Sequence, residues 1–189
     1  MPKDEELHIF SRAEEYIYKI IVIGDPAVGK TSLLNSYVKK KFTKQYLPTV
    51  GVNILKHTIK FESKDKGKID ISLLLWDLAG QPQFYMLHKP YYNGANAMIL
   101  VFDITRSSTF SNINNWFNEC VKYGLSSIPR LLVGNKVDLK NERKIVLPHI
   151  EHLSNKLNAP YFETSAKTGE NVGAIFQKIT ELVYNRQID

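Results

Sequence analysis

Cysteine is nearly absent from this sequence of 189 residues, in which Cys120 is the single one. One cysteine cannot form a disulfide within the chain, and no neighbouring set of Cys and His has the spacing of a zinc site. No run reaches the roughly 18 to 20 apolar residues of a membrane-spanning helix. The start, MPKDEELHIF, lacks the basic and apolar regions of a signal peptide. We therefore expect a cytoplasmic protein, free or peripheral to membranes.

Signals for lipid attachment are also missing. The chain ends in YNRQID without a cysteine for prenylation, and proline at position 2 replaces the glycine that N-myristoylation requires. We expect that no lipid anchor is encoded. Any membrane association is then expected through a partner or through residues 1–15, where Leu7, Ile9 and Phe10 lie among charged residues. Packing of these side chains against the domain is the alternative.

Acidic residues are fewer than basic ones, 19 against 25, which gives a formal net charge of +6. The lysines are scattered through VKKKFTK, ESKDKGK and LKNERK and are not gathered on one helix. Scattered charge is typical of a solvated surface, whereas a nucleic-acid-binding protein concentrates it on one face. We therefore expect no nucleic-acid partner.

Residues 24–31 read GDPAVGKT and match G-x-x-x-x-G-K-[ST], the pattern of a phosphate-binding loop. The β-branched run YIYKIIVI precedes the loop and KTSLLNSYV follows it with apolar residues at helical spacing, which predicts strand, loop and helix. Glycine allows the backbone N–H groups to approach a phosphate closely, and Lys30 can reach the β- and γ-phosphates. The residues of this segment expected to bind the nucleotide are Asp25, Pro26, Ala27, Val28, Gly29, Lys30, Thr31 and Ser32.

Short apolar runs alternate with amphipathic segments along the rest of the chain. AMILVFDI (97–104), RLLVGNKVD (130–138) and APYFETSA (159–166) each precede a segment with helical spacing. Residues 52–80 hold two strand-like runs joined by a polar turn, which predicts a hairpin with an antiparallel edge strand. We therefore predict an α/β fold of the P-loop NTPase type, a three-layer α/β/α sandwich around a six-stranded, mostly parallel sheet.

A magnesium ion is expected beside the phosphates. Thr31 offers a hydroxyl to the ion, and Asp77, at the end of the apolar run SLLLWD, can hold the ion through water. Proteins commonly bind Mg²⁺ next to substrate phosphates in this way. A helix-capping role for Asp77 is the alternative.

The segment GNKVD, residues 134–138, predicts a guanine pocket. The Asp138 carboxylate can accept hydrogen bonds from the ring N–H and the exocyclic amine of guanine, a pair that adenine does not offer. Asn135 can meet the other edge of the ring, and the stem of Lys136 can pack against the nucleotide. Alone, the segment would be interpreted as an Asx turn, but the phosphate loop and ETSAKTG downstream favour the pocket.

With these motifs the chain resembles the Ras superfamily of small GTPases, and most closely its Rab family. The resemblance covers about residues 18–186, with GDPAVGKT, YLPTVGVN, WDLAGQ, NKVD and ETSAK in the family's order, and with TVGVNI, LLLWDLAGQ, YYNGA and LVFDIT similar to Rab segments. It implies that Gln81 orients the attacking water and that Thr49 binds Mg²⁺ and senses the γ-phosphate. It also implies nucleotide contacts from Phe42, Tyr46, Gly80, Ser165, Ala166 and Lys167.

Three positions depart from the Rab pattern. Pro26 has no N–H and stands where Rabs carry a small hydroxyl residue or glycine, which affects the docking of an arginine finger more than nucleotide binding. Pro82 restrains Gln81 toward an extended backbone. Ile54 replaces the aromatic residue that is typical of the effector-facing surface, so we expect a non-standard partner surface.

The predicted organisation is an N-terminal extension, residues 1–15, and one small GTPase domain, residues 16–189. We expect the protein to bind GTP and GDP with Mg²⁺, to hydrolyse GTP slowly through Gln81 and Lys30, and to act as a switch in membrane trafficking. Its expected partners are effectors, exchange factors and GTPase-activating proteins. One alternative is a GTP-binding interaction module with negligible hydrolysis, which Pro26 and Pro82 favour. Another is a P-loop ATPase or metabolite kinase, against which NKVD speaks.

Overall fold

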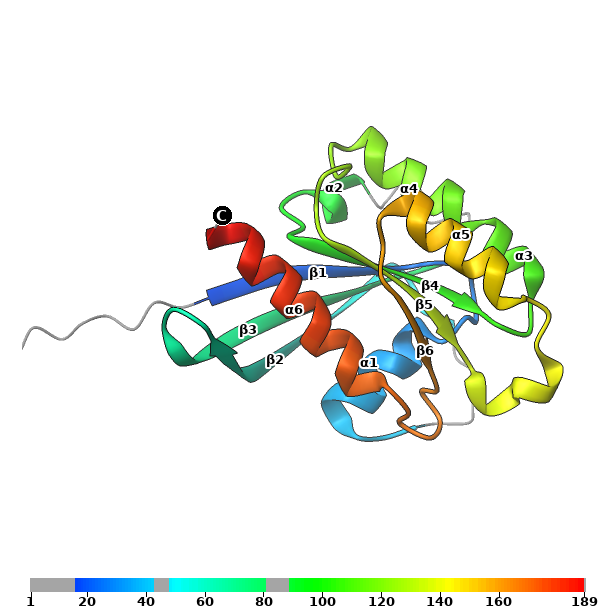
Figure 1. Ribbon diagram of the computed structural model, residues 1–189, viewed down its shortest axis with the longest axis horizontal. Coiled ribbons are helices and arrows are strands. Elements are labelled where there is room, and N and C mark those ends of the chain that lie inside the picture. Colours follow the sequence, from blue (N-terminus) through cyan, green and yellow to red (C-terminus); the bar gives the residue numbers. More distant parts are fainter. Residues whose placement is uncertain (1–15, 43–47, 81–88, 189) are drawn as a thin grey trace, which may run out of the picture.

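A computed structural model describes residues 16–42, 48–80 and 89–188 of the chain (Figure 1). The predicted three-layer α/β/α sandwich is confirmed, because one six-stranded sheet carries helices on both faces. The predicted extension, residues 1–15, lies outside the described residues, and its division from the domain stays a prediction. The strands are β1 (Tyr16–Ile23), β2 (Val52–Ser63), β3 (Gly67–Leu78), β4 (Ala97–Asp103), β5 (Arg130–Asn135) and β6 (Tyr161–Thr164).

The sheet has the order β2-β3-β1-β4-β5-β6. All neighbouring strands run parallel except β2 and β3, which form the predicted antiparallel hairpin. Exposed and half-buried side chains alternate along most of β2, as expected for an edge strand with one covered face, whereas every residue of β4 is buried. The direction in which successive strands are added to the sheet reverses at β1. In open α/β sheets, ligands bind beyond the carboxyl ends of the strands at such a point.

Helices connect the parallel strands. The segment after β4, predicted as one amphipathic stretch, is divided at Asn112 into two helices, and the short helix before β4 was not predicted. Over the described residues, no helix is long and apolar enough to span a bilayer. The helices are α1 (Lys30–Lys39), α2 (Lys89–Tyr92), α3 (Ser107–Ser111), α4 (Ile113–Lys122), the 3₁₀ helix η2 (Val137–Glu142), α5 (Leu147–Leu157) and α6 (Val172–Ile188).

Two hydrophobic cores lie on the two faces of the sheet. Alternate residues of β1 point to opposite faces, so Ile20 packs in the core with Leu34 of α1 and Phe176 of α6. Ile21 packs on the other face, in the core that contains Trp116 of α4 and residues of α5. Figure 1 shows α1 and α6 on one side of the sheet and α2 to α5 on the other. Helices on both faces of the sheet therefore pack against the central strand β1, and the phosphate loop begins at the end of this strand.

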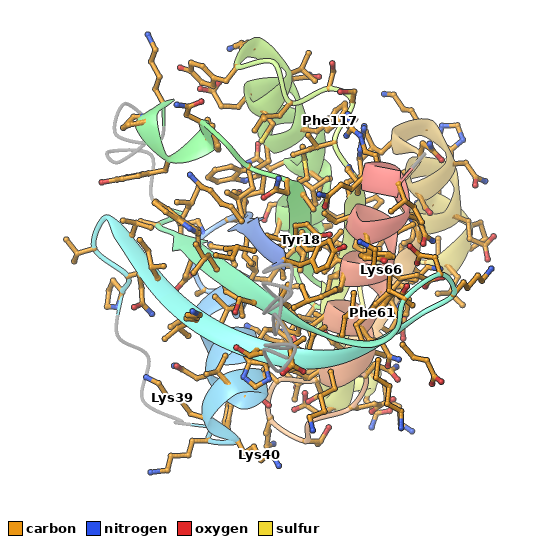
Figure 2. The ribbon with its side chains drawn as sticks, turned by 90° about the vertical axis from the view of Figure 1, so that its left-hand side faces the viewer. Tyr18, Lys39, Lys40, Phe61, Lys66 and Phe117 are labelled. Atoms are coloured by element: carbon orange, nitrogen blue, oxygen red, sulfur yellow. The ribbon has the colours of Figure 1, made fainter. Side chains whose placement is uncertain are left out.

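The turn of the β2–β3 hairpin is anchored to α6. The Tyr184 hydroxyl donates to Asp65 Oδ1 at 2.9 Å and lies 2.9 Å from Ser63 Oγ. The rings of Phe61 and Tyr184 are 5.1 Å apart, and Figure 2 shows Phe61 and Lys66 of the hairpin beside this helix. These contacts lie at the amino ends of the parallel strands. The loops of the candidate site gather at the opposite, carboxyl ends.

Candidate functional site

The predicted site residues gather at the carboxyl ends of β1, β3, β5 and β6. The phosphate loop follows β1, Asp77 lies near the end of β3, Asn135 ends β5, and Ser165 follows β6. Because these strands are parallel, their carboxyl ends meet at one edge of the sheet. Segments that are far apart in the sequence thus form one site.

The phosphate loop has a backbone that requires glycine at two positions. Gly24 has φ 143°, and a Cβ there would lie 2.1 Å from the carbonyl oxygen of Val101. Gly29 has φ 102°, and a Cβ there would lie 2.2 Å from Asn135 Nδ2. Ala27 also has a positive φ of 59°. The loop is therefore tightly wound against β4 and β5, and α1 begins directly after it.

The side chain of Lys30 folds back under the loop. Its ammonium donates to the carbonyl oxygens of Gly24 at 2.6 Å and Asp25 at 3.0 Å. Burial lowers the pKa of Lys30 to about 8, while the charges of Asp77 and Asp25 raise it. A Cβ on Gly80 would lie 2.5 Å from the carbonyl oxygen of Gly24 and 2.6 Å from the carbonyl carbon of Asp25, so only glycine lets this segment approach the loop backbone so closely. The lysine is placed to meet an anion between the loop and Gly80.

Three oxygen-bearing side chains converge beside Lys30. Thr31 Oγ1 donates to Asp77 Oδ2 at 2.5 Å and lies 2.8 Å from Thr49 Oγ1. Asp77 is completely buried, and its Oδ1 has no hydrogen-bond partner among the described residues. Burial raises the pKa of Asp77, against the hydrogen bond from Thr31 and the charge of Lys30. An unpaired buried carboxylate oxygen is costly unless something else satisfies it.

This oxygen set fits a magnesium ion. Mg²⁺ prefers carboxylate, hydroxyl and water oxygens, and it is usually bound by one or two protein groups together with substrate phosphates. Asp77 Oδ1 and the hydroxyls of Thr31 and Thr49 offer such oxygens. Within residues 16–42, 48–80 and 89–188, no three His, Cys, Asp or Glu side chains gather as a metal site. The hydroxyl and carboxylate oxygens of Thr31, Thr49 and Asp77 suit a hard cation because such cations prefer oxygen ligands.

Asn135 connects the phosphate loop to the segment after β6. Its Nδ2 donates to the carbonyl oxygen of Val28 at 2.9 Å, and its Oδ1 accepts from Ala166 N and Thr164 Oγ1, each at 3.2 Å. The side chain is buried, with 1% of the residue exposed. Asn135 thus joins the end of β5 to the phosphate loop and to the end of β6 through one amide group.

The Asp138 carboxylate is held in a fixed direction. Its Oδ1 accepts from Ser165 Oγ at 2.7 Å, and Lys167 Nζ lies 3.6 Å from its Oδ2. Ser165 Oγ in turn accepts from Thr168 N at 3.1 Å. The Asp138 side chain remains 14% exposed, so a ligand can still reach it. A carboxylate held in this way can accept two N–H groups from one edge of a planar base.

The remaining predicted residues have different surroundings. The Asp25 carboxylate accepts from Asn112 Nδ2 at 2.5 Å and from Trp116 Nε1 at 2.8 Å, so it points toward α4. Phe42 follows α1 and is 41% exposed. Ser32, in the first turn of α1, is half-buried. Tyr46 and Gln81, and Pro82 beside Gln81, lie outside the described residues.

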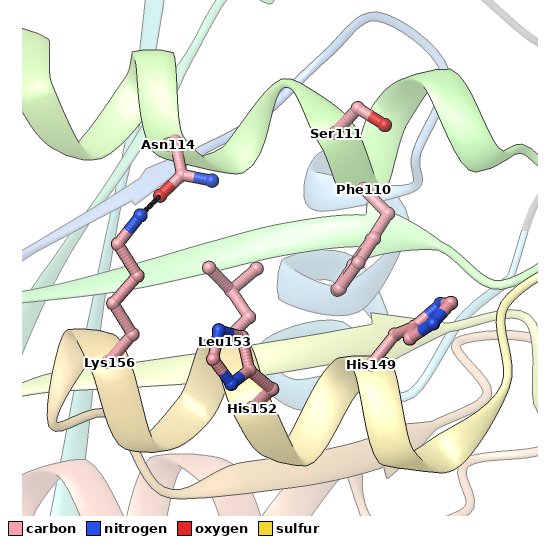
Figure 3. A pocket seen from close by; sticks show the side chains of 7 residues that line it. All are labelled: Phe110, Ser111, Asn114, His149, His152, Leu153 and Lys156. Atoms are coloured by element: carbon pink, nitrogen blue, oxygen red, sulfur yellow. Dashed lines mark hydrogen bonds between the residues drawn. The ribbon is translucent and has the colours of Figure 1, made fainter.

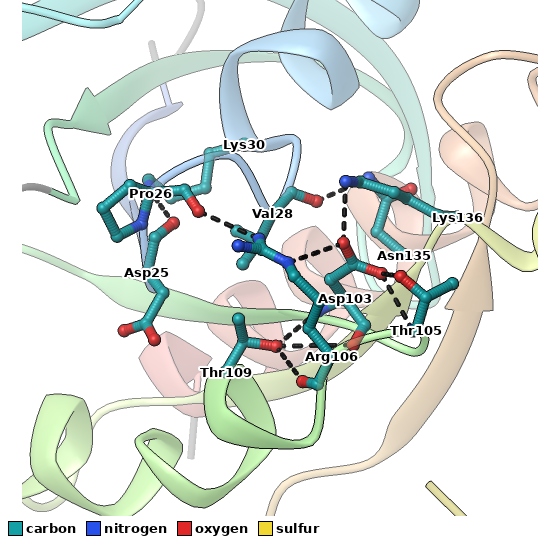
Figure 4. Close-up of polar contacts among 10 residues, drawn as sticks. All are labelled: Asp25, Pro26, Val28, Lys30, Asp103, Thr105, Arg106, Thr109, Asn135 and Lys136. Carbon is teal, nitrogen blue, oxygen red and sulfur yellow. Dashed lines mark hydrogen bonds and ion pairs between the residues drawn. The ribbon is translucent and has the colours of Figure 1, made fainter. Parts of the chain in front are cut away.

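Sequence reasoning missed a polar group at the end of β4. Asp103 is buried and forms ion pairs with Lys136 Nζ at 2.7 Å and Arg106 Nε at 3.0 Å (Figure 4). Burial raises the pKa of Asp103, but hydrogen bonds from Lys136 and Thr105 hold it below its usual value. The signal was present in the sequence, because Asp103 ends the buried strand β4 and Arg106 follows three positions later, at the same ends of the strands as the other motifs.

A groove between helices lies apart from these residues. Its volume is about 270 Å³, and Figure 3 shows that its lining side chains come from α3, α4 and α5. None of the predicted site residues lines it. The lining residues are Phe110, Ser111, Asn114, His149, His152, Leu153 and Lys156.

Comparison with known proteins finds relatives that are named as Ras-related or GTP-binding proteins. The sequence model described as the Ras family matches residues 19–185. The chain is 36% identical to the Ras-related protein SEC4 of Candida albicans over 179 residues, 95% of this chain and 83% of the relative. It is 40% identical to the Ras-related protein RABG3f of Arabidopsis thaliana over 172 residues, 87% and 81% of the two chains. It is 34% identical to the GTP-binding protein ypt1 of Schizosaccharomyces pombe, covering 91% and 82%.

Proposed function

This chain belongs to the Ras family as a Rab-like GTPase, and we propose that it binds GTP and GDP with Mg²⁺ at the carboxyl edge of its sheet and switches between two partner-binding forms. The observation that carries this proposal is the convergence of the buried Lys30 ammonium and the unpaired Asp77 Oδ1 beside the phosphate loop. A cation and a free carboxylate oxygen at one loop suit a phosphate and its metal ion.

The phosphate chain binds in the loop between Gly24 and Thr31. Backbone N–H groups surround the β-phosphate, and the Lys30 ammonium exchanges its carbonyl partners for oxygens of the β- and γ-phosphates. Thr31, Thr49 and Asp77 hold the magnesium ion, which neutralises phosphate charge when it is bound. Because Lys30 is buried, its charge acts in a poorly solvated place and stabilises the transferring phosphoryl group strongly.

The base binds between the loop after β5 and the segment after β6. Asp138 accepts hydrogen bonds from the guanine edge, and Asn135, Lys136, Ala166 and Lys167 complete the pocket, with Phe42 on the ring. Ser165 orients the Asp138 carboxylate. Two acceptor oxygens facing one edge favour guanine over adenine, because adenine presents no matching pair of donors.

Hydrolysis breaks the bond between the γ-phosphorus and the bridging oxygen as water attacks in line. We assign the orientation of this water to Gln81, while Lys30 and the loop N–H groups stabilise the charge. After phosphate leaves, the segments that contain Thr49 and Gly80 lose a ligand. The proposed output is a change in partner binding, in membrane trafficking, with effectors, exchange factors and GTPase-activating proteins as partners.

One face beside these segments suits protein partners. Ile54 is 46% exposed on β2, and the rings of Trp76 and Tyr91 lie 6.0 Å apart. Lys19 Nζ lies 3.8 Å from the centre of the Trp76 ring, which places a cation over this aromatic surface. A partner that contacts this face meets the aliphatic Ile54 where an aromatic residue is typical of a Rab, so we propose a non-standard partner surface.

A single-turnover experiment tests the proposal against a binding module with negligible hydrolysis. Purified protein is loaded with radiolabelled GTP, and GDP formation is followed with Mg²⁺ and with EDTA. We expect tight GTP and GDP binding, no competition by ATP, and slow Mg²⁺-dependent hydrolysis. Binding without hydrolysis would favour the binding module. Competition by ATP would contradict the guanine pocket.

A further inference from the structure

Arg106 joins the phosphate loop to the buried carboxylate at the end of β4. Its Nη2 donates to the carbonyl oxygen of Pro26 at 2.9 Å, and its Nε donates to Asp103 Oδ2 at 3.0 Å (Figure 4). Pro26 and Arg106 are 80 positions apart in the chain. The planar guanidinium can serve two acceptors in fixed directions at once, which the point charge of a lysine cannot do.

The backbone of Arg106 is itself held rigidly. Its N–H donates to the carbonyl oxygen of Asp103 at 3.0 Å, and its carbonyl oxygen accepts from Thr109 N at 3.1 Å and from Thr109 Oγ1 at 2.7 Å. Thr109 Oγ1 also accepts from Asp103 N at 3.1 Å. These bonds form a compact turn at the start of α3. The guanidinium therefore extends from a fixed base.

Asp103 shares its carboxylate between the two loops of the site. Its Oδ2 lies 2.7 Å from Lys136 Nζ and 3.0 Å from Arg106 Nε, and its Oδ1 accepts from Thr105 N and Oγ1. The Asp103 side chain is 1% exposed, whereas that of Arg106 is 40% exposed. A buried carboxylate with several donors stays ionised and keeps both cations in place. Lys136 lies in the guanine segment and Arg106 reaches the phosphate loop.

The bond to Pro26 sets the direction of the next N–H group. Proline has no N–H, so its carbonyl is the hydrogen-bonding group that its backbone offers. A trans peptide is planar, so the carbonyl of Pro26 and the N–H of Ala27 point in opposite directions. With the carbonyl held by Arg106, the Ala27 N–H points away from Arg106. Within the described residues, no group accepts a hydrogen bond from it.

We propose that Arg106 is a positioning residue for the phosphate loop, which turns the Ala27 N–H toward the β- and γ-phosphates by holding the Pro26 carbonyl. This inference rests on the proposed guanine-nucleotide function. Arg106 touches the protein and not the reacting atoms in this arrangement, because two of its nitrogens are used for Pro26 and Asp103. Arg106 is therefore expected to strengthen the binding of nucleotides that carry a β-phosphate, and not of those with an α-phosphate alone.

Affinities for GTP, GDP and GMP test this assignment in the full chain with Mg²⁺. In Arg106→Gln we expect GTP and GDP to bind at least about tenfold more weakly, about 1.4 kcal/mol, and GMP to change less than twofold. Arg106→Lys can reach one acceptor at a time, so we expect about a threefold loss for GTP and GDP. The matched control is Arg186→Gln, because Arg186 Nη1 also donates to a backbone carbonyl, that of Ser127, at 2.5 Å on another part of the surface. We expect no change in the control.

The outcomes separate this inference from the proposed function. Equal losses for all three nucleotides, or unchanged affinities in Arg106→Gln, would overturn the positioning role while leaving nucleotide binding intact. Failure of the wild-type protein to bind any guanine nucleotide would overturn the proposed function itself. Thermal unfolding shows whether each variant folds. If Arg106→Gln does not fold, the affinities for the three nucleotides are compared in Arg106→Lys instead.

Discussion

Ser165 Oγ donates a hydrogen bond to Asp138 Oδ1 at 2.7 Å, although 27 positions separate the two residues. The Ser165 hydroxyl also accepts from the backbone N–H of Thr168. The direction of the Asp138 carboxylate is therefore set from outside its own loop, before any base is bound. In the proposed function, the oxygens of this carboxylate that face the pocket select the base.

Asp138→Asn is expected to change the base preference. The substitution replaces one acceptor oxygen with a donor, which opposes the guanine amine and suits the additional carbonyl of xanthine. We expect weaker GTP binding and stronger XTP binding, measured by competition against a fluorescent nucleotide. Asp70→Asn, at an exposed position of β3, is the control and is expected to leave the preference unchanged. An unchanged GTP preference in Asp138→Asn would contradict the pocket.

Gln81→Leu is expected to slow hydrolysis far more than it weakens binding. The side chain is assigned to the attacking water and not to the nucleotide, so GTP affinity should stay within a few-fold. Single-turnover hydrolysis should fall at least about tenfold, about 1.4 kcal/mol of transition-state stabilisation. Equal rates in the variant and the wild type would show that Gln81 takes no part in the unassisted reaction, as expected if Pro82 holds it out of reach.

Gly29→Ala is expected to damage the phosphate loop. A Cβ at this position would lie 2.2 Å from Asn135 Nδ2, and the φ of 102° is unfavourable for alanine. We expect the free energy of unfolding to fall by about 1–3 kcal/mol from backbone strain, measured by denaturant titration, together with weaker GDP binding. Gly173→Ala in α6, where an added Cβ would meet no neighbouring atom within 4 Å, should not destabilise the protein, because alanine forms helices better than glycine. Similar values for the two variants would argue against a tightly packed loop.

Tyr184→Phe is expected to lower the melting temperature without affecting nucleotide affinity. The change removes a hydroxyl that contacts Asp65 and Ser63 in the hairpin turn. Loss of such a contact in a domain of this size should lower the melting temperature by about 2–4 °C. Tyr123→Phe, at an exposed ring on the other side of the sheet, is the control. An equal melting temperature in Tyr184→Phe and the wild type would show that these hydroxyl contacts add nothing to the thermal stability of the domain.

Residues 1–15 are expected to contribute a contact with lipid. Leu7, Ile9 and Phe10 lie among charged residues, a weak amphipathic pattern. Liposome flotation of the full chain and of a chain that starts at Tyr16 tests this prediction. Flotation of the full chain alone would support it. Equal behaviour of the two would contradict a role of this segment in lipid binding.

The sequence determined the fold and the family through local patterns. Strand β1, the loop GDPAVGKT and α1 are contiguous, so their spacing alone predicted strand, loop and helix, and the structure confirms these elements. The hairpin was predictable because a turn joins two apolar runs with no helix between them. Family membership was predicted from the order of five motifs and confirmed by the relatives. The roles of the site residues stay predictions.

Only the tertiary structure decided where the polar side chains of these segments point. Asp25 belongs to the phosphate-loop motif, yet its carboxylate accepts from Trp116, 91 positions away. The Arg106 bond to Pro26 and the division of the α3–α4 segment at Asn112 were likewise unpredicted. Apolar spacing reports which face of an element is buried. A hydrogen bond depends on the distance and angle between two atoms, and packing of the whole chain sets these for residues far apart in the sequence.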